Sequence, residues 1–406
     1  MNETTRRTFL RNSGGMAALA LMPKFGLAGP SSLDLEVAVI GAGRQGRAIL
    51  AELLKFEGVC LGAICDVDER RLESGARRAK DARTYTDHRE LFSAESGVKA
   101  VIVATPTHLH AAIAQEALKA GKHVYCEAPL ASTIEDCAAV LEAAERSDRV
   151  FQTGMQGRSN PIYKLANSFA RAGAIRDLVS LRAQYHKKTS WRTPADDPAR
   201  DKALNWRLDP EVSLGLAGEF GTQQFDVIHW FADRYPKSVR GSGSVRLHQD
   251  GREVADSVRC DLDFGEGLDL AYEATLANSF EGQYELLCGT MGTIKLAWTA
   301  GWLFKEADAV TQGWEVYANR VQFHNEEGIT LIADATKLAK QGKLQEGVGL
   351  PNPPLYYALS DFLRSVADSA PVACSAREGA RAAAVGIAAA RAVASAAEVE
   401  VDTTFF

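Results

Sequence analysis

Short, almost wholly apolar runs alternate with amphipathic stretches from about residue 33 to residue 154. Uninterrupted apolar strands are typical of a parallel sheet that is covered by helices on both faces. The alternation of strand and helix therefore predicts a doubly wound α/β domain. Strands are expected at 35–40, 59–66, 98–104, 123–127 and 150–153, and helices at 47–56, 69–80, 108–120 and 134–146.

Beyond residue 175 the pattern changes to longer stretches in which apolar and polar positions alternate. This period predicts strands with one packed face and one free face, as in an open, largely antiparallel sheet. The strands of this α+β region are expected at 178–184, 239–247, 257–264, 268–276, 284–288 and 292–297. Two helices, expected at 354–369 and 377–397, close the chain.

The first predicted strand ends in three glycines with the spacing G-x-G-x-x-G, at Gly41, Gly43 and Gly46. In such a loop the glycines permit a tight turn, a close approach to a pyrophosphate, and close packing of helix on strand. The N-terminus of the following helix also attracts phosphate groups. Asp66 ends the second strand, where a carboxylate can accept a hydrogen bond from a ribose hydroxyl. These features predict a dinucleotide site that favours NAD over NADP.

The motif and the two patterns define the expected domains. Residues 31–155 are expected to form a Rossmann dinucleotide-binding domain. Residues 156–370 are expected to form an α+β domain that holds the substrate and the oligomer contacts. Residues 371–406 are expected to form a helix and a tail that pack back on the Rossmann domain, and residues 1–30 an export signal.

Composition and charge exclude other classes of function. The chain has 406 residues and a formal net charge of −6, with scattered Lys and Arg, so no nucleic-acid partner is expected. Its seven Cys include no C-x-x-C pair, so no metal site is expected. The apolar stretch near the N-terminus is short and is interrupted by Pro23 and Lys24, so no membrane insertion is expected.

The N-terminal segment carries a twin-arginine pattern, in which Arg6 and Arg7 precede Phe9, Leu10 and a Gly- and Ala-rich stretch. This arrangement is typical of an export signal with cleavage near residue 28, and it predicts a periplasmic or secreted protein. Twin-arginine export carries folded proteins, and little free NAD is expected outside the cell. We therefore expect the NAD to be bound before export and held tightly.

Further motifs follow the predicted strands: Ala-Thr-Pro-Thr-His at 104–108, Ala-Gly-Lys-His-Val at 120–124 and Glu-Ala-Pro at 127–129. Together with the glycine loop and the segment 218–231, they resemble the Gfo/Idh/MocA family of sugar oxidoreductases. The resemblance implies a Rossmann domain followed by an open α+β sheet. It also implies a sugar, glycoside or polyol substrate and a homodimer or homotetramer.

The chain departs from the family pattern at two catalytic positions. Family members usually carry lysine in E-K-P, where this chain has Ala128, and histidine in D-x-G-x-H-x-x-D, where it has Gln223. Neither a methyl group nor an amide transfers protons near neutral pH. Another acid or base is then needed. The catalytic candidates are Glu127, His110, Gln223, Asp226 and His229.

The remaining candidates surround the predicted cofactor and substrate positions. Aromatic faces and planar guanidinium groups suit hydroxyl-rich rings, although such residues also occur in ordinary packing. The cofactor-binding candidates are Gly41, Gly43, Arg44, Gln45, Gly46, Asp66, Thr105, Pro106, His108, Glu127 and Pro129. The substrate-binding candidates are Arg158, Tyr163, His186, Lys188, Trp191, Arg192, Trp206 and Arg207.

Three functions remain open from the sequence. The first is an oxidoreductase that acts on a sugar, glycoside or polyol with tightly retained NAD and an unusual proton relay. The second is an NAD-retaining glycosidase or lyase that works through a transient keto-sugar, for which no net redox partner is needed. The third is a carbohydrate-binding protein that NAD stabilises and that does not turn over, which the residues at 128 and 223 would permit.

Overall fold

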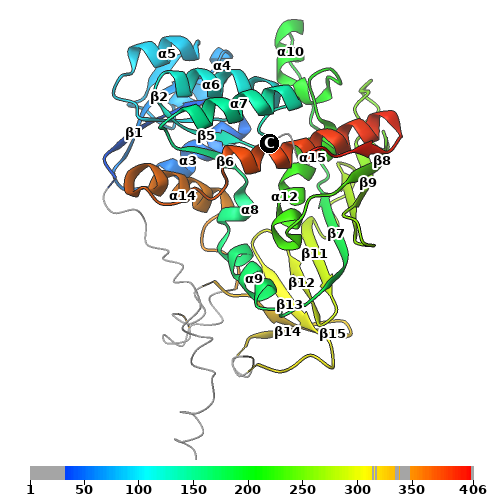
Figure 1. Cartoon of the computed structure of the whole chain (residues 1–406). Helices are drawn as coiled ribbons and strands as arrows, with labels where there is room; N and C mark the ends of the chain where they lie inside the picture. The colour runs from blue at the N-terminus through cyan, green and yellow to red at the C-terminus, as the bar shows by residue number, and fades with distance from the viewer. Residues whose placement is uncertain (1–32, 313–314, 316–317, 334–337, 339–347, 404–406) are drawn as a thin grey trace, which may run out of the picture.

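The computed structural model describes residues 33–312, 315, 318–333, 338 and 348–403. The predicted export signal at 1–30 lies outside these residues. The described chain is built on two sheets, one at each end of the molecule, with helices around and between them (Figure 1). No helix among the described residues is long and apolar enough to span a bilayer.

The first sheet is parallel throughout and has the strand order β3-β2-β1-β4-β5-β6. This is the order of a Rossmann fold, in which ligands bind where the order reverses, beside β1. The prediction of a doubly wound sheet is confirmed. The strands are β1 (Leu35–Ile40), β2 (Val59–Cys65), β3 (Arg83–Tyr85), β4 (Ala100–Val103), β5 (His123–Glu127) and β6 (Phe151–Gly154).

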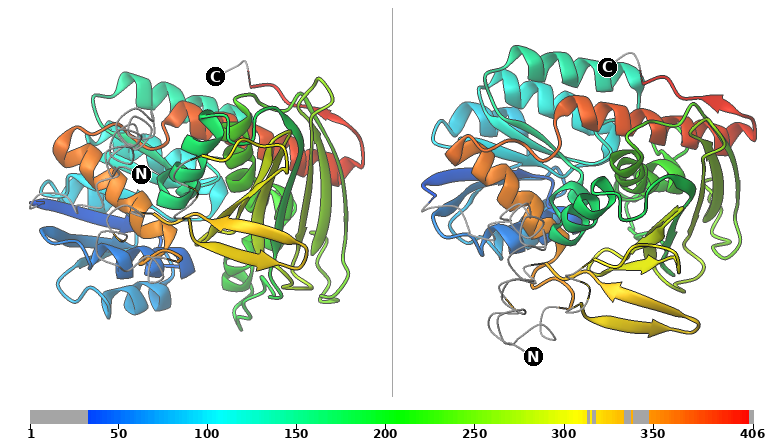
Figure 2. Two further views of the ribbon diagram at one scale, coloured as in Figure 1. Left: turned by 90° about the horizontal axis from the view of Figure 1, so that it is seen from below. Right: turned by 60° about the horizontal axis from the view of Figure 1, so that its bottom comes forward.

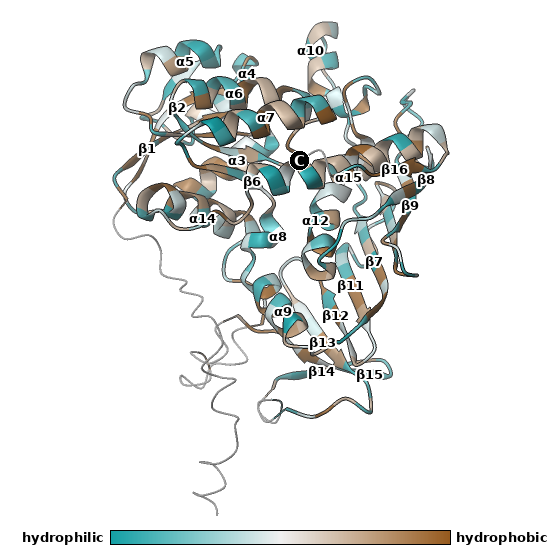
Figure 3. Ribbon diagram, viewed as in Figure 1, coloured by the Kyte–Doolittle hydropathy of each residue, from teal (hydrophilic) through white to brown (hydrophobic). Residues whose placement is uncertain are grey.

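Helices cover both faces of this sheet, which explains its uninterrupted apolar strands. In β1, Val37 and Val39 pack into one layer while Ala38 and Ile40 pack into the other. One layer contains α3 (Arg44–Leu53), α4 (Glu69–Ala76) and α14 (Pro354–Asp368). The other contains α5 (His88–Ala94), α6 (His110–Lys119), α7 (Ile134–Arg146) and α15 (Ala376–Ser395). In Figure 3 apolar and polar residues alternate along α14, as expected of a helix with one buried face.

The second sheet has ten strands in the order β14-β15-β13-β12-β11-β7-β10-β9-β8-β16. Only β7 and β10 pair in parallel, so the predicted open, largely antiparallel sheet is confirmed. Its strands are β7 (Leu178–His186), β8 (Ser238–Ser244), β9 (Ser257–Asp263), β10 (Asp269–Thr275), β11 (Gln283–Gly289), β12 (Gly292–Leu296), β13 (Gly301–Lys305), β14 (Arg320–Phe323), β15 (Glu326–Thr330) and β16 (Val399–Glu400).

The predicted strand at 239–247 runs too far, since β8 ends at Ser244. The carboxylate of Asp256 accepts hydrogen bonds from the backbone amides of residues 246, 247 and 248, at 2.7 to 2.9 Å. These bonds take the amides out of any strand pairing. The buried carboxylate of Asp256, ten residues beyond residue 246, thus ends the strand.

Short helices line the inner side of the second sheet and connect it to the first. They are α8 (Gln156–Ser159), α9 (Pro161–Arg171), α11 (Gly215–Glu219) and α12 (Gly221–Ala232). Helix α15 contacts α7 and β6 of the Rossmann domain and also α11, α12 and β8 of the second domain. It therefore lies between the two sheets, where Figure 2 shows it as the long red helix.

Candidate active site at the mouth of the Rossmann sheet

Two glycines of the loop after β1 are required by the packing of the chain itself. Gly41 has φ +98°, and a Cβ there would lie 2.6 Å from the carbonyl oxygen of Ala104. A Cβ on Gly46 would lie 1.7 Å from the carbonyl oxygen of Gly41, because α3 begins directly against this turn. Both positions thus set the tight strand-to-helix turn that a dinucleotide loop needs.

Gly43 is different, because the protein leaves space beside it. A Cβ on Gly43 would meet only the end of the Arg71 side chain, at 3.6 Å. Gly43 also gives α3 no side-chain cap, and the first turn of α3 carries no acidic residue. The free backbone N–H groups of Arg44 and Gln45 therefore form an uncapped, partially positive helix end, with only the end of a flexible side chain beside it. These residues fit the pyrophosphate of a dinucleotide.

Asp66 lies at the end of β2, directly beside the glycine loop, where the sequence places it. One of its carboxylate oxygens accepts from the amide of Ala42 at 2.7 Å, and the other from the amide of Asp68 at 2.9 Å. The carboxylate thereby holds the glycine loop and the loop after β2 in place, and it retains lone pairs for a ribose hydroxyl. Burial and the nearby charges of Arg78, Arg71 and Arg44 lower the pKa of Arg47, which shows that positive charge is concentrated here.

Glu127 ends β5 and is buried in the same site. Gln45 of the glycine loop donates from Nε2 to its Oε1 at 3.1 Å. Burial is the largest influence on this carboxyl group and raises its pKa from 4.5 to about 7. Glu127 is therefore a catalytic candidate whose carboxyl group changes protonation near neutral pH.

His110 holds two loops together. Its Nδ1 lies 2.8 Å from the carbonyl oxygen of Pro129, and its Nε2 lies 2.9 Å from that of Thr105. The ring is buried, which lowers its pKa to about 4. Because both nitrogens face backbone carbonyls, the geometry favours a structural role over the catalytic one predicted.

The loop after β4 meets the second domain through a buried carboxylate. Glu219 on α11 accepts from the Thr107 hydroxyl at 2.9 Å, and the Nε of Arg207 lies 3.9 Å from it. Neither Thr107 nor Glu219 was among the predicted site residues. The signal was present for Glu219, which stands first in the stretch that matches the family's D-x-G-x-H pattern.

Aromatic rings surround Arg207. Its guanidinium lies 4.3 Å from the ring centre of Trp206 and 5.9 Å from that of Trp191. Trp206 also meets His108 edge to face at 5.8 Å, and Phe220 packs against Trp191 at 5.5 Å. Tyr185 extends this group, because it stacks on Phe220 at 4.0 Å. The structure thus brings the predicted residues Trp191, Trp206, Arg207 and His108 together.

Several polar atoms near these residues are buried and have no hydrogen-bond partner among the described residues. They are Thr105 Oγ1, His108 Nδ1 and Arg207 Nε. Buried polar atoms in folded proteins are almost always hydrogen-bonded, so unpaired ones at the mouth of a Rossmann sheet are expected at a ligand site. They support the assignment of the mouth of this sheet as the site of the cofactor and its substrate.

Arg158 and Asp226 form a buried ion pair. Arg158 donates to both carboxylate oxygens of Asp226, at 2.9 and 2.8 Å, and also to Glu378 at 2.6 Å. Asp226 is 1% exposed and Arg158 is 8% exposed. The predicted substrate role of Arg158 and the predicted catalytic role of Asp226 find no support in this geometry.

His229 and Tyr163 also have partners within the second domain. His229 stacks on Tyr235 with 3.5 Å between ring centres, and burial lowers its pKa. The Tyr163 hydroxyl donates to the buried Glu285 at 2.6 Å. These contacts favour structural roles for both residues.

The remaining substrate candidates lie at the end of β7 and on the loop that follows it. Arg192 pairs with Asp250 at 3.1 Å, so its charge is already compensated. Lys188 is exposed, and its backbone amide donates to Ser279. The Nδ1 of His186 is buried without a partner among the described residues. Pro106, the remaining cofactor candidate, begins the short turn Thr107–Leu109 after β4.

The two positions that depart from the family pattern are integrated into the structure. The Gln223 amide donates to the carbonyl of Gly154 at 2.8 Å and accepts from the amide of Gln156 at 3.2 Å. Ala128 packs against an apolar cluster formed by Met155, Cys374 and Ala382. Neither position offers a titratable group.

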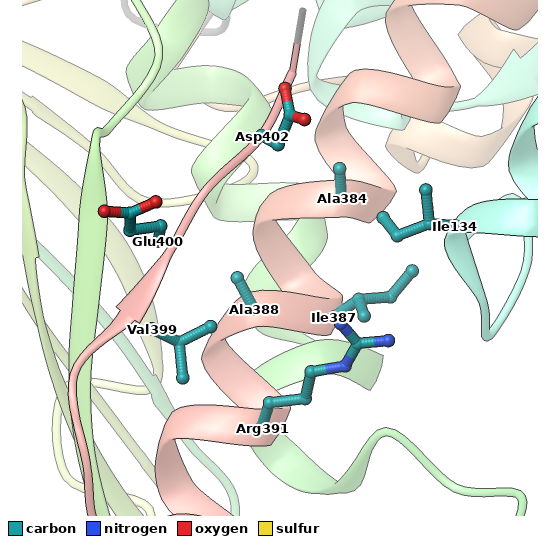
Figure 4. Close-up of a pocket in the computed structure, with 8 residues that line it drawn as sticks. All are labelled: Ile134, Ala384, Ile387, Ala388, Arg391, Val399, Glu400 and Asp402. Atoms are coloured by element: carbon teal, nitrogen blue, oxygen red, sulfur yellow. The ribbon is translucent and has the colours of Figure 1, made fainter. Parts of the chain in front are cut away.

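A small cavity lies apart from this site, between α7, α15 and β16 (Figure 4). Its volume of about 90 Å³ is well below the roughly 300 Å³ at which small-molecule pockets begin. Within the described residues, no group of three or more His, Cys, Asp or Glu side chains is arranged to hold a metal ion.

Comparison with known proteins agrees with the geometry. Residues 35–155 match the profile of the GFO_IDH_MocA oxidoreductase family, described as an NAD-binding Rossmann fold. Residues 183–401 match the family's C-terminal alpha/beta domain. The two matches together cover most of the chain.

Individual relatives are distant. Inositol 2-dehydrogenase 1 of Saccharopolyspora erythraea is 27% identical over 270 residues, which is 65% of this chain and 74% of that protein. Levoglucosan dehydrogenase of Pseudarthrobacter phenanthrenivorans is 28% identical over 50% of this chain, and a glycosyl hydrolase family 109 protein of Shewanella sp. is 29% identical over 48%. The chain spans about half the length of these two relatives, 52% and 51%.

A solved structure has the same fold over nearly the whole chain. Levoglucosan dehydrogenase in complex with NADH and levoglucosan superposes with a TM-score of 0.71, covering 90% of this chain and 99% of that one, at 23% identity. The motifs, the two sheets and the two profile matches all agree. The chain belongs to the Gfo/Idh/MocA family of NAD(P)-dependent oxidoreductases.

Proposed function

We propose that this protein interconverts a hydroxyl and a carbonyl group of a sugar, glycoside or polyol with tightly held NAD, and that Glu127 is its acid/base. The observation that carries the proposal is the position and pKa of Glu127. It is the buried carboxyl group at the end of β5, bonded to Gln45 of the dinucleotide loop, and its pKa is raised to about 7. A group of this pKa both takes and returns a proton near neutral pH.

The residues that would hold NAD are those around the mouth of the sheet. The amides at the start of α3 and the space beside Gly43 fit the pyrophosphate, and Asp66 fits a ribose hydroxyl. NAD, when bound, supplies a two-electron oxidant for a carbon that bears a hydroxyl group. Glu127 would take the hydroxyl proton, while Gln45 fixes one of its two carboxylate oxygens.

The region beyond Glu127 has the composition of a carbohydrate site. The indoles of Trp191 and Trp206 offer flat apolar faces to a sugar ring, and the Arg207 guanidinium, whose Nε has no hydrogen-bond partner among the described residues, lies near both rings. The named activity of levoglucosan dehydrogenase and inositol dehydrogenase, two relatives of this chain, points to the same substrate class.

The test is a panel of sugars, glycosides and polyols, with NADH absorbance at 340 nm recorded for wild type, Glu127→Gln and Glu285→Gln. Glu285 is a matched control because it is also buried with a pKa raised to about 7, yet it lies in the second domain. We expect the wild-type rate to change with a midpoint near pH 7. Glu127→Gln should lower the rate at least about 100-fold, in line with the loss of a general acid/base. Glu285→Gln should keep both the rate and its pH profile.

Equal rates for Glu127→Gln and wild type would contradict the role of Glu127. No change in NADH absorbance with any member of the panel, from protein with bound nucleotide, would contradict the oxidoreductase proposal. If no aglycone is released either, the result would favour the third function, a carbohydrate-binding protein that NAD stabilises.

A second candidate function is an NAD-retaining glycosidase that works through a transient keto-sugar. It is favoured by the matches to glycosyl hydrolase family 109 proteins and to the alpha-N-acetylgalactosaminidase of Shewanella oneidensis, 28% identical over 48% of this chain. Release of aglycone without added NAD and without net NADH would support it. Reduction of the bound NAD that stops after one equivalent would support the oxidoreductase instead.

Export and assembly complete the proposal. The Arg6-Arg7 pattern supports twin-arginine export to the periplasm or beyond, with NAD bound beforehand. Replacement of both arginines by lysine should leave the folded protein in the cytoplasmic fraction.

The open second sheet supports a homodimer or homotetramer, which light scattering coupled to gel filtration would measure.

A further inference from the structure

A loop of the second domain crosses to the Rossmann domain between β7 and α11. We name residues 191–208 of this loop the strap; it contains α10 (Pro198–Leu204) and the turn Trp206–Leu208. The strap is closed on itself, since Asn205 accepts from the amide of Thr193 at 2.6 Å and donates back to its carbonyl at 3.0 Å. The strap is therefore a defined structural unit.

The strap touches the Rossmann domain at two separate points. Arg200 on α10 donates from Nε to the Asp68 carboxylate at 2.6 Å, just beyond the end of β2. Trp206 packs edge to face on His108, just beyond the end of β4. In Figure 1, α10 stands beside the Rossmann helices, away from the rest of the second domain.

The glycine loop lies between these two points. The strand order places β1 between β2 and β4, so the loop at Gly41, Gly43 and Gly46 is flanked by the two contacts. A dinucleotide bound across the carboxyl ends of these strands lies on the side of the sheet that the strap spans. Besides burial, the charges of Arg44 and Arg71 lower the pKa of Arg207 at the end of the strap. This end of the strap is therefore close to the phosphate side of the site.

We propose that the strap retains the bound NAD and that the Arg200–Asp68 pair is its latch. This inference rests on the proposed function, because it needs NAD at this site. The latch is well placed to hold, since only 28% of the Arg200 side chain and 11% of the Asp68 side chain are exposed. The strap opens and closes only when this pair breaks and reforms, and NAD leaves through that opening. Arg200 and Asp68 are positioning residues that do not take part in the reaction.

The test compares the release of NADH by wild type, Arg200→Gln and Asp68→Asn. Asparagine at 68 keeps an oxygen that caps the amide of Arg71 at the start of α4, so the helix is retained while the charge is lost. Lys202→Gln is the control, because Lys202 lies on the same helix and pairs only weakly, at 3.7 Å, with Asp209. Its side chain is 76% exposed.

Release is measured by loading purified protein with NADH, adding excess NAD and following the loss of bound NADH fluorescence. Loss of a partly buried ion pair is expected to speed release about tenfold in Arg200→Gln and in Asp68→Asn. The double variant should be no faster than either single variant, since both remove one interaction. Lys202→Gln should stay within about twofold of wild type, as expected for an exposed charge. Circular dichroism checks that each variant is folded.

Unchanged release in folded Asp68→Asn and Arg200→Gln would overturn the latch and leave the proposed function intact. Additive effects in the double variant would also overturn it, because the two side chains would then act separately. A wild type that binds no NADH would overturn the proposed function itself.

Discussion

Gln223 stands where relatives of this family usually have a histidine, and its amide joins two segments. It donates to the carbonyl of Gly154 and accepts from the amide of Gln156, so it connects α12 to the chain that follows β6. A neutral imidazole has one donor and one acceptor as well, but on a ring of different reach. The substitution has therefore exchanged a titratable group for a structural one.

Gln223→His is predicted to lower the free energy of unfolding by about 1–3 kcal/mol, because at least one of the two partly buried hydrogen bonds is lost. It should not raise turnover on its own, since Ala128 still offers no lysine. Urea unfolding and the sugar panel measure the two effects. A stable variant with higher activity would show that the position kept its catalytic geometry.

Glu285 gives a prediction of the pH dependence of stability. Burial raises its pKa in the folded protein to about 7, above the ordinary value of 4.5. Between about pH 4.5 and pH 7 the folded protein therefore holds a proton that the unfolded chain releases. The stability that this bound proton adds to the folded protein is present at low pH and is lost as the pH rises through 7.

Glu285→Gln, which stays neutral, should thus be more stable than wild type at pH 8 by about 1–3 kcal/mol and equal to it near pH 4.5. Thermal melting of both proteins across this range measures the difference. A difference that does not vary with pH would contradict the raised pKa.

At the scale of elements, one network of ion pairs connects three helices. Arg158 on α8 pairs with Asp226 on α12 and with Glu378 in the first turn of α15. Glu378 also takes part in the cap of α15, because its carboxylate accepts from the amide of Ser375 at 2.7 Å. The group therefore fixes α15 between the two domains.

Asp226→Ala is predicted to lower the free energy of unfolding by about 3–5 kcal/mol, since it leaves the Arg158 charge buried without its main partner. Asp361→Ala is a suitable control, as its pair with Lys164 is more exposed. Chemical denaturation measures both. Loss of catalysis in a fully stable Asp226→Ala protein would instead support the catalytic role predicted from the sequence.

The elements predicted from the sequence are those that the local pattern of apolar and polar residues determines. The strands β1, β4 and β5 are apolar on both faces and were expected within a few residues. The polar edge strands β3 and β14 were not expected, because few of their side chains are buried and pairing to a neighbour alone defines them. Helix α3 starts three residues before the predicted helix, since its first amides belong to the glycine loop.

The same distinction holds for the site. Gly41, Gly43 and Gly46 lie within six residues, so their roles follow from spacing alone. The pairing of Arg158 with Asp226 joins residues 68 positions apart, and nothing in either local sequence indicates it. Buried pairs of this kind depend on the fold, which is why the pairing of Arg158, predicted to bind substrate, with Asp226, predicted to be catalytic, was not foreseen.

At the scale of the whole molecule, residues of both domains meet beside the carboxyl ends of the Rossmann strands. The Rossmann domain contributes the glycine loop, Asp66 and Glu127, and the second domain contributes Glu219, Arg207 and the strap. The cofactor would thus be held by one domain and retained by the other.

The nucleotide content of the purified protein tests this account most directly. Protein isolated without added nucleotide is precipitated with acid, and the released nucleotide is identified and quantified by mass spectrometry. The account predicts about one NAD or NADH per folded chain, retained through gel filtration. A cooperatively folded protein that carries no nucleotide, and whose melting temperature does not rise with about 1 mM NAD, would contradict it.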